Sequence, residues 1–173
     1  MRPFVVASVF WLAAATGCVA ACSVPQDAQQ QVILRFDVTD MGAMGDVPLL
    51  TLRADGHVAV PLRGEIREGR LPETEVQDLL DAMVSDGVLD LTTEQIADAL
   101  APQSTGGGQV ALPGLIADGA TSYISLDMPG CRVSLSAPDS ALNSLAHPDA
   151  APLQAFRRSE LRLLDIVMRL QRG

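Results

Sequence analysis

The chain contains no lysine, so its 12 basic residues are all arginines, and they face 21 aspartates and glutamates. The net charge of −9 opposes contact with phosphate backbones, which excludes nucleic acid as a partner. Aromatic residues make up only 3% of the chain. Carbohydrate binders and single-strand binders use exposed aromatic rings as stacking platforms, so we do not expect carbohydrate recognition either.

Signatures of common catalytic and nucleotide sites are also missing from the sequence. It has no G-x-S-x-G, no P-loop, no H-E-x-x-H and no dinucleotide fingerprint. Ser140, His147 and Asp149 are close in sequence, but triads are assembled by the fold, so this proximity assigns no role. We therefore expect no catalytic residue and no cofactor. A pair of carboxylates is the one route to an enzyme that the sequence leaves open.

An acidic cluster near the start of the domain has residues of the type that bind calcium. Asp37, Asp40 and Asp46 lie around two glycines, Gly42 and Gly45. Their spacing does not match an EF-hand loop, which needs D-x-[DN]-x-[DN]-G and a glutamate at position 12. We expect an acidic turn here and no metal site.

The first 22 residues have the pattern of an export signal. Met1 and Arg2 give a positive start, Phe4 to Ala15 form an apolar run, and small residues follow. The sequence Val19-Ala20-Ala21-Cys22 resembles a bacterial lipobox. This resemblance implies cleavage before Cys22, a diacylated Cys22, and anchoring to a membrane of the cell envelope. Ser23 after that cysteine favours the periplasmic face of the outer membrane if the host has two membranes.

Three other interpretations of this region stay open. Cys18 follows Ala15-Thr16-Gly17, a poorer lipobox because residue 15 is not a larger aliphatic. Ordinary cleavage near Ala21 would give a soluble secreted or periplasmic protein. An uncleaved membrane anchor is the third, because residues 3–26 carry no charge and are long enough to span a bilayer.

The state of Cys131 depends on whether Cys22 is lipidated. If Cys22 carries the lipid, Cys131 is the only thiol of the mature domain and cannot form an internal disulfide or a zinc site. Alternation in residues 131–135 places Cys131 on an apolar face with Val133 and Leu135, so we expect a buried, inert thiol. If Cys22 is not lipidated, a Cys22–Cys131 disulfide can form in an oxidising compartment.

The organisation expected is a signal peptide over 1–21, a flexible tether over 22–31 and a single α+β domain over 32–173. In this fold class, antiparallel hairpins pack against one or two helices. Alternation, turn dipeptides and capping signals predict the elements. They are a strand at 32–38, a hairpin at 49–62 turning at Asp55-Gly56, a charged connection at 64–70, helices at 72–86 and 93–100, an irregular loop at 101–120, a hairpin at 121–136, a connection at 138–151 and a helix at 152–172.

One face of the last expected helix carries Arg158, Arg162, Asp165, Arg169 and Arg172, at spacings of three or four residues. Such a face suits anionic lipid or an acidic partner, or else it is an ordinary solvated helix surface. The acid at position 165, placed to pair with the arginines on either side, favours the second interpretation.

The residues 50–56, 71–76, Leu79 and Leu80, with the final leucine-rich helix, loosely resemble a group of uncharacterised bacterial lipoprotein and secreted domains. The resemblance covers most of residues 48–173 and implies no catalytic residues. We expect an envelope lipoprotein that acts as a non-catalytic binding or assembly module with a protein partner. The alternatives are a small periplasmic hydrolase that uses the 101–120 loop as a lid, or a periplasmic ligand or calcium binder.

Overall fold

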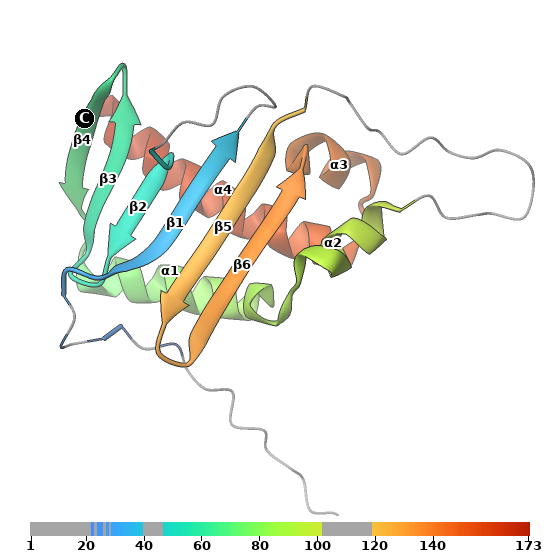
Figure 1. The fold of residues 1–173 in the computed structure, drawn as a ribbon, viewed down its shortest axis with the longest axis horizontal. Coiled ribbons are helices and arrows are strands. Elements are labelled where there is room, and N and C mark those ends of the chain that lie inside the picture. The colour runs from blue at the N-terminus through green and yellow to red at the C-terminus, as the bar shows by residue number, and fades with distance from the viewer. Residues whose placement is uncertain (1–21, 23, 26, 28, 40–46, 102–118) are drawn as a thin grey trace, which may run out of the picture.

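The computed structural model describes residues 22, 24–25, 27, 29–39, 47–101 and 119–173. A six-stranded antiparallel sheet with strand order β4-β3-β2-β1-β5-β6 forms the front layer, and the helices lie behind it (Figure 1). The expected α+β class is confirmed. The two hairpins merge into one sheet because β1 (Val32–Thr39) pairs with β2 (Leu50–Arg53) on one side and with β5 (Thr121–Met128) on the other.

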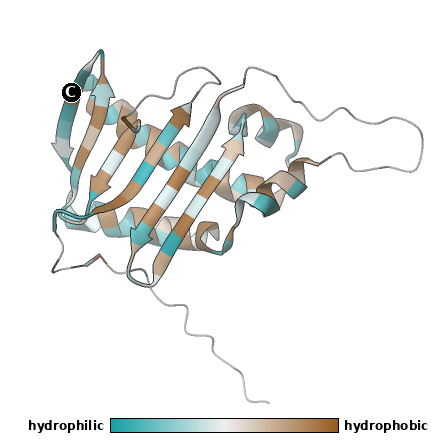
Figure 2. Ribbon diagram, in the orientation of Figure 1, coloured by the Kyte–Doolittle hydropathy of each residue, from teal (hydrophilic) through white to brown (hydrophobic). Residues whose placement is uncertain are grey.

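Alternation along the strands separates a buried face from a solvent-facing one (Figure 2). This is the usual pattern of an antiparallel sheet that is covered on one side only. The side chains buried beneath the sheet include Leu34, Phe36, Leu50, Leu52, Val58, Val60, Ile124, Leu126, Val133 and Leu135. Ile33 is also fully buried, because the register shifts between Val32 and Leu34 and a bulge interrupts the expected alternation.

The Asp55-Gly56 turn joins β2 to β3 (His57–Leu62), as predicted. Gly56 has a φ of 81°, in the left-handed region that favours glycine. Its carbonyl accepts a hydrogen bond from the amide of Leu71 at 2.9 Å, so the turn also holds the chain that leads into the first helix.

Replacing Gly56 with alanine is expected to lower the free energy of unfolding by about 2–3 kcal/mol, from backbone strain and a clash. The new Cβ would lie 2.4 Å from the carbonyl oxygen of Leu71, which is backbone and cannot swing away. Gly64→Ala is the matched control, since Gly64 has a φ of 87° and nothing within 4 Å of the same atom. Urea denaturation of both variants separates the effect of backbone strain, which both share, from that of the clash, which only Gly56→Ala has. Equal losses in the free energy of unfolding would show that the clash contributes nothing.

Residues 65–70 form a strand, β4 (Glu65–Arg70), where the sequence pattern predicted only a charged connection. The turn before it uses two residues with positive φ, Arg63 at 53° and Gly64 at 87°. Five of the six residues of β4 are exposed, so the strand shows no apolar alternation. Charged residues on an edge strand protect it against pairing with other chains. Because they replace the apolar alternation of a half-buried strand, the sequence pattern did not predict β4.

The first two helices match their predicted positions. Helix α1 (Glu73–Ser85) buries Val76, Leu79, Leu80 and Met83, and Gly87 ends the helical region with a φ of 80°. A short 3-10 turn, η1 (Val88–Asp90), leads to α2 (Thr93–Leu100). The capping box is present, with Thr92 accepting from the amide of Gln95 and the Gln95 side chain accepting from the amide of Thr92.

The C-terminal half completes both layers. Strand β6 (Cys131–Pro138) pairs with β5 through a turn at Pro129-Gly130 and forms the other edge of the sheet. Two turns of helix, α3 (Ser140–Ala146), lie in the expected connection, and α4 (Ala151–Arg172) runs behind the sheet (Figure 1). Among the described residues, no helix is both long enough and apolar enough to cross a membrane.

The segment predicted to be a flexible tether packs against the domain at its described residues. Cys22 is 4% exposed and Val24 packs on the hydrophobic core. The carbonyls of Gln29 and Gln31 accept hydrogen bonds from the amides of Asp55 and Ala54, at 3.0 and 2.9 Å. The folded domain therefore begins about ten residues earlier than the strand pattern indicated.

Candidate functional site

A disulfide joins Cys22 to Cys131 at the start of β6 and bridges 109 positions of sequence. Both cysteines are 4% exposed. Cys131 lies on the buried face with Val133 and Leu135, as the alternation predicted, but it is paired rather than a free thiol. The bond fixes the N-terminal segment to the end of the sheet where β5 turns into β6.

This arrangement is the one expected for an unlipidated Cys22. A sulfur atom in a disulfide has no valence left for a thioether, so the disulfide and the predicted lipidation of Cys22 exclude each other. The structure shows the disulfide. Persistent disulfides are formed outside the reducing cytosol, in secreted and periplasmic proteins.

A buried carboxylate is the most densely hydrogen-bonded side chain that the structure describes. Glu160 of α4 is 3% exposed and accepts hydrogen bonds from the hydroxyls of Ser122 on β5 and Ser140 on α3, the latter at 2.5 Å. The guanidinium of Arg157 donates to the same carboxylate at 2.6 Å. The hydroxyl of Ser159, the preceding residue in sequence, is fully buried and has no hydrogen-bond partner among the described residues. Glu160 thus links α4 to β5 and α3 through side-chain hydrogen bonds.

Sequence reasoning missed Glu160, although the signal for it was present. Glu160 lies four residues after Phe156 and three before Leu163, on the buried stripe of the helix. A charged residue on an apolar stripe indicates a buried partner network, because an isolated buried charge is strongly unfavourable.

The three residues Ser140, His147 and Asp149 do not form a triad. The hydroxyl of Ser140 donates to Glu160, whereas the recorded hydrogen bonds of His147 are made by its backbone. The other histidine, His57, lies 3.5 Å from Glu68 across β3 and β4, on the sheet surface.

Three of the four arginines predicted on this face of α4, Arg158, Arg162 and Arg169, are paired with acids. Arg158 and Arg162 contact Asp86 after α1, at 2.8 and 3.4 Å, and Arg169 pairs with Glu75 of α1 and with Asp165. The hydrogen bond that Arg169 donates to the carboxylate of Glu75 raises the pKa of Arg169. This confirms a solvated, paired helix face, with most of the acids coming from the neighbouring helix rather than from Asp165 alone.

The acidic residues near the start of the domain have structural roles where the structure describes them. One oxygen of Asp37 accepts from the amides of Val38 and Leu49, at 2.9 and 3.3 Å. Asp40 and Asp46 lie outside the described residues, as does most of the 101–120 loop. Within the described ranges, no three histidine, cysteine, aspartate or glutamate residues are grouped to hold a metal ion.

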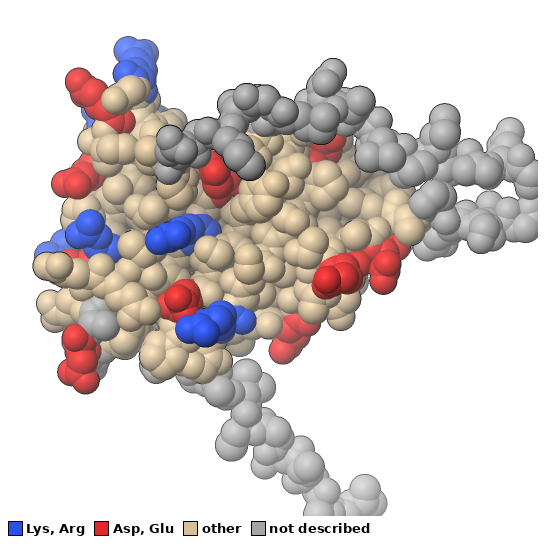
Figure 3. Space-filling view, viewed as in Figure 1, with Lys and Arg blue, Asp and Glu red and all other residues tan. Residues whose placement is uncertain are grey.

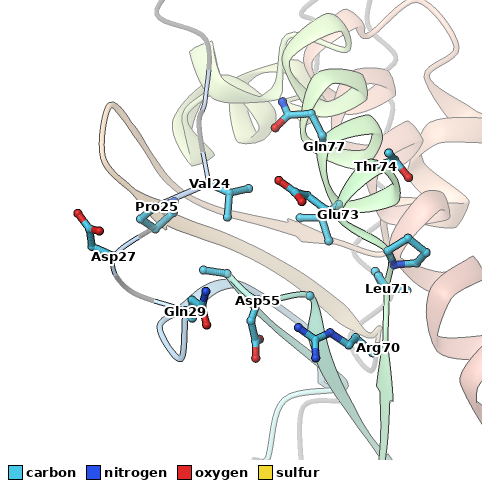
Figure 4. Close-up of a pocket in the computed structure, with 14 residues that line it drawn as sticks. Val24, Pro25, Asp27, Gln29, Asp55, Arg70, Leu71, Glu73, Thr74 and Gln77 are labelled. Atoms are coloured by element: carbon cyan, nitrogen blue, oxygen red, sulfur yellow. The ribbon is translucent and has the colours of Figure 1, made fainter.

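A groove of 1130 Å³ lies between the N-terminal segment and the start of α1. Figure 4 shows Val24 and Pro25 on one wall, with the Glu73 carboxylate pointing across toward them and Arg70 directed toward Asp55. The described lining mixes apolar and polar side chains, and its charged members are Asp27, Asp55, Glu73 and Arg70. One wall consists of the segment that the disulfide holds in place, so the groove depends on that bond.

All the helices that the structure describes lie on one side of the sheet, and none of them covers its other face (Figure 1). In register across it lie Thr51, Arg35, Ser125 and Ser134, and in the next row Asp37, Tyr123 and Ser136. Tyr123 is 45% exposed. Figure 3 shows this face, where charged side chains are sparse over β5 and β6. A shallow hollow of 290 Å³ lies between Arg35 and Arg132, and its lining includes the two small serines Ser125 and Ser134.

Comparisons with protein-family models, with curated proteins and with solved structures found no match to this chain.

Proposed function

We propose that this protein is an exported module of the bacterial cell envelope that binds another protein through the β5–β6 part of its open sheet face. The observation that carries the proposal is the composition of that face. Tyr123 lies between Thr121 and Ser125 along β5 and opposite Ser136 on β6, and Asp37 is the charged residue opposite it on β1. Tyrosine and serine together give large contact area and adaptable hydrogen bonding, which is why they are enriched in protein-recognition surfaces.

The size of the face supports a protein partner. Six strands spaced about 4.8 Å apart, with lengths from about 14 Å for β2 to about 27 Å for the longest, give a face with an area on the order of 600 Å². A standard interface covers about 800 Å² on each partner. A flat area of this size suits a protein surface better than a small molecule, which binds in concave sites.

Export is supported by two independent features of the chain. The first 22 residues have the order of charge, apolar run and small residues of a signal sequence. The Cys22–Cys131 disulfide suits an oxidising compartment. The proposed partner is therefore another envelope protein, one that offers a surface of low charge to fit between Arg35 and Arg132.

Site-specific photocrosslinking in the native host tests the binding face. A photoreactive residue at Tyr123 is expected to give a discrete adduct with one envelope protein, identified by mass spectrometry. The matched control is Leu161 on α4, which is 50% exposed on the helical side. A second substitution, Ser134→Arg, places a charge beside the site and is expected to abolish the adduct. An adduct from Leu161 alone, or one that survives Ser134→Arg, would contradict the proposal.

A further inference from the structure

The open face of the sheet has two halves that differ in charge. Over β5 and β6 the residues beside Tyr123 carry hydroxyl groups, whereas the β1–β4 half carries three exposed arginines, Arg35, Arg53 and Arg70. We propose that these three residues, called here the arginine patch, bind an acidic segment of a partner protein through its carboxylates. The inference extends the binding face proposed above and rests on that proposal for the envelope location of the partner.

The register of the strands brings the three arginines onto one side of the sheet. Arg35 lies opposite Thr51, and Arg53 follows Thr51 by two residues, so Arg35 and Arg53 are diagonal neighbours about 7–8 Å apart. Arg70 pairs with His57, which precedes a buried valine and therefore points away from the core. Figure 3 shows arginine side chains over the middle of this face and toward β4.

The acids that share the open face with the arginine patch are engaged elsewhere. On β1, Asp37 accepts hydrogen bonds from two backbone amides. On β4, Glu68 lies 3.5 Å from the imidazole of His57. The nearest acid of β5 in the same face, Asp127, pairs with Arg132 at 2.7 Å. The patch therefore keeps its positive charge and presents three guanidinium groups to a ligand.

The arginine patch differs in this respect from the arginines of the last helix. Ion pairs hold Arg158, Arg162 and Arg169 to acids, but none of the ion pairs between described residues includes an arginine of the patch. Arg70 is directed toward Asp55 at the end of the patch (Figure 4). Like charges at neighbouring positions of a sheet repel each other. Their gathering on an uncovered face, in a chain with 21 acids, therefore indicates a role in binding.

A short acidic segment of a protein fits the arginine patch better than an anionic membrane does. A guanidinium group binds a carboxylate through two parallel hydrogen bonds. Alternate residues of an extended chain repeat about every 6.6 Å, close to the spacing of Arg35 and Arg53. A membrane would approach the whole face, and its negative surface would repel a molecule with a net charge of −9. The proposed occupant is therefore an extended segment with acids at alternate positions.

Photocrosslinking at Thr51 in the native host tests the arginine patch. A photoreactive residue there is expected to form an adduct with the envelope protein that Tyr123 captures, on a peptide with Asp or Glu at alternate positions. Arg35→Glu and Arg53→Glu are each expected to lower the yield of this adduct about tenfold, because an attraction becomes a repulsion. Arg172→Glu is the matched control, since it makes the same charge change at an exposed arginine of α4 and should leave the yield unchanged.

Three results at Thr51 would overturn the inference: an adduct whose peptide lacks acids, an adduct with a phospholipid, or a yield that Arg35→Glu and Arg172→Glu change equally. No adduct at Thr51, with the Tyr123 adduct intact, would also overturn it and would leave the proposed β5–β6 binding face standing. An acidic peptide captured at Thr51 without any adduct at Tyr123 would instead overturn the β5–β6 proposal alone. The two failures are therefore distinguishable.

Discussion

Replacing Glu160 with alanine is expected to lower the free energy of unfolding by about 3–5 kcal/mol, the usual cost of breaking a buried charge pair. The substitution removes the acceptor for Ser122, Ser140 and Arg157 together. Both serines are 3% exposed, so water cannot easily replace the lost partner. The variant would therefore leave two buried serine hydroxyls without their acceptor in one place.

Two further variants isolate the cause of that loss. Glu160→Gln keeps the shape and one carbonyl acceptor, and we expect it to lose about 1–2 kcal/mol. Glu65→Ala, an exposed glutamate on β4, is the surface control and should stay within about 0.5 kcal/mol of wild type. Urea denaturation followed by circular dichroism gives all three values. A loss below about 1 kcal/mol for Glu160→Ala would show that the network contributes little to stability.

Most of the fold could be predicted because its elements carry local signals. The Asp55-Gly56 turn, the alternation of β5 and β6, and the Thr92–Gln95 capping box each specify structure within a few residues. Strand β4 could not be found in this way. It is an edge strand whose charged residues face solvent, and only its register with β3 makes it a strand.

The candidate sites were less predictable because they depend on contacts between distant positions. Glu160 meets Ser122 across 38 positions of sequence, and the cysteines meet across 109. Residues 23–31 are mostly polar and show no periodicity, so the packing of the described ones on the domain follows from the disulfide and from Val24 rather than from any local pattern. The pairing of Cys22 was one of two options, and only the fold brings its partner near.

Removing the disulfide is expected to lower the free energy of unfolding by about 3–4 kcal/mol, because a cross-link over a long loop restricts the unfolded chain. For a chain of this size, that loss corresponds to a fall in Tm of about 6–16 °C. Cys131→Ser, Cys22→Ser and the double variant should all show the same fall, because each one abolishes the same bond. Cys18→Ser is the matched control and should melt like wild type.

The same variants should show where the bond acts in the folded state. Without it, the remaining contacts of the described N-terminal residues include the packing of Val24 and the hydrogen bonds that the amides of Ala54 and Asp55 donate to the carbonyls of Gln31 and Gln29. We expect these two amides to exchange faster with solvent in Cys131→Ser, while the amide of Gln95 in the α2 capping box stays unchanged. Uniform acceleration at all three amides would mean that the bond stabilises the whole domain and does not specifically hold the segment. Faster exchange at Ala54 and Asp55 alone would show that the disulfide specifically fixes the described N-terminal residues against the sheet.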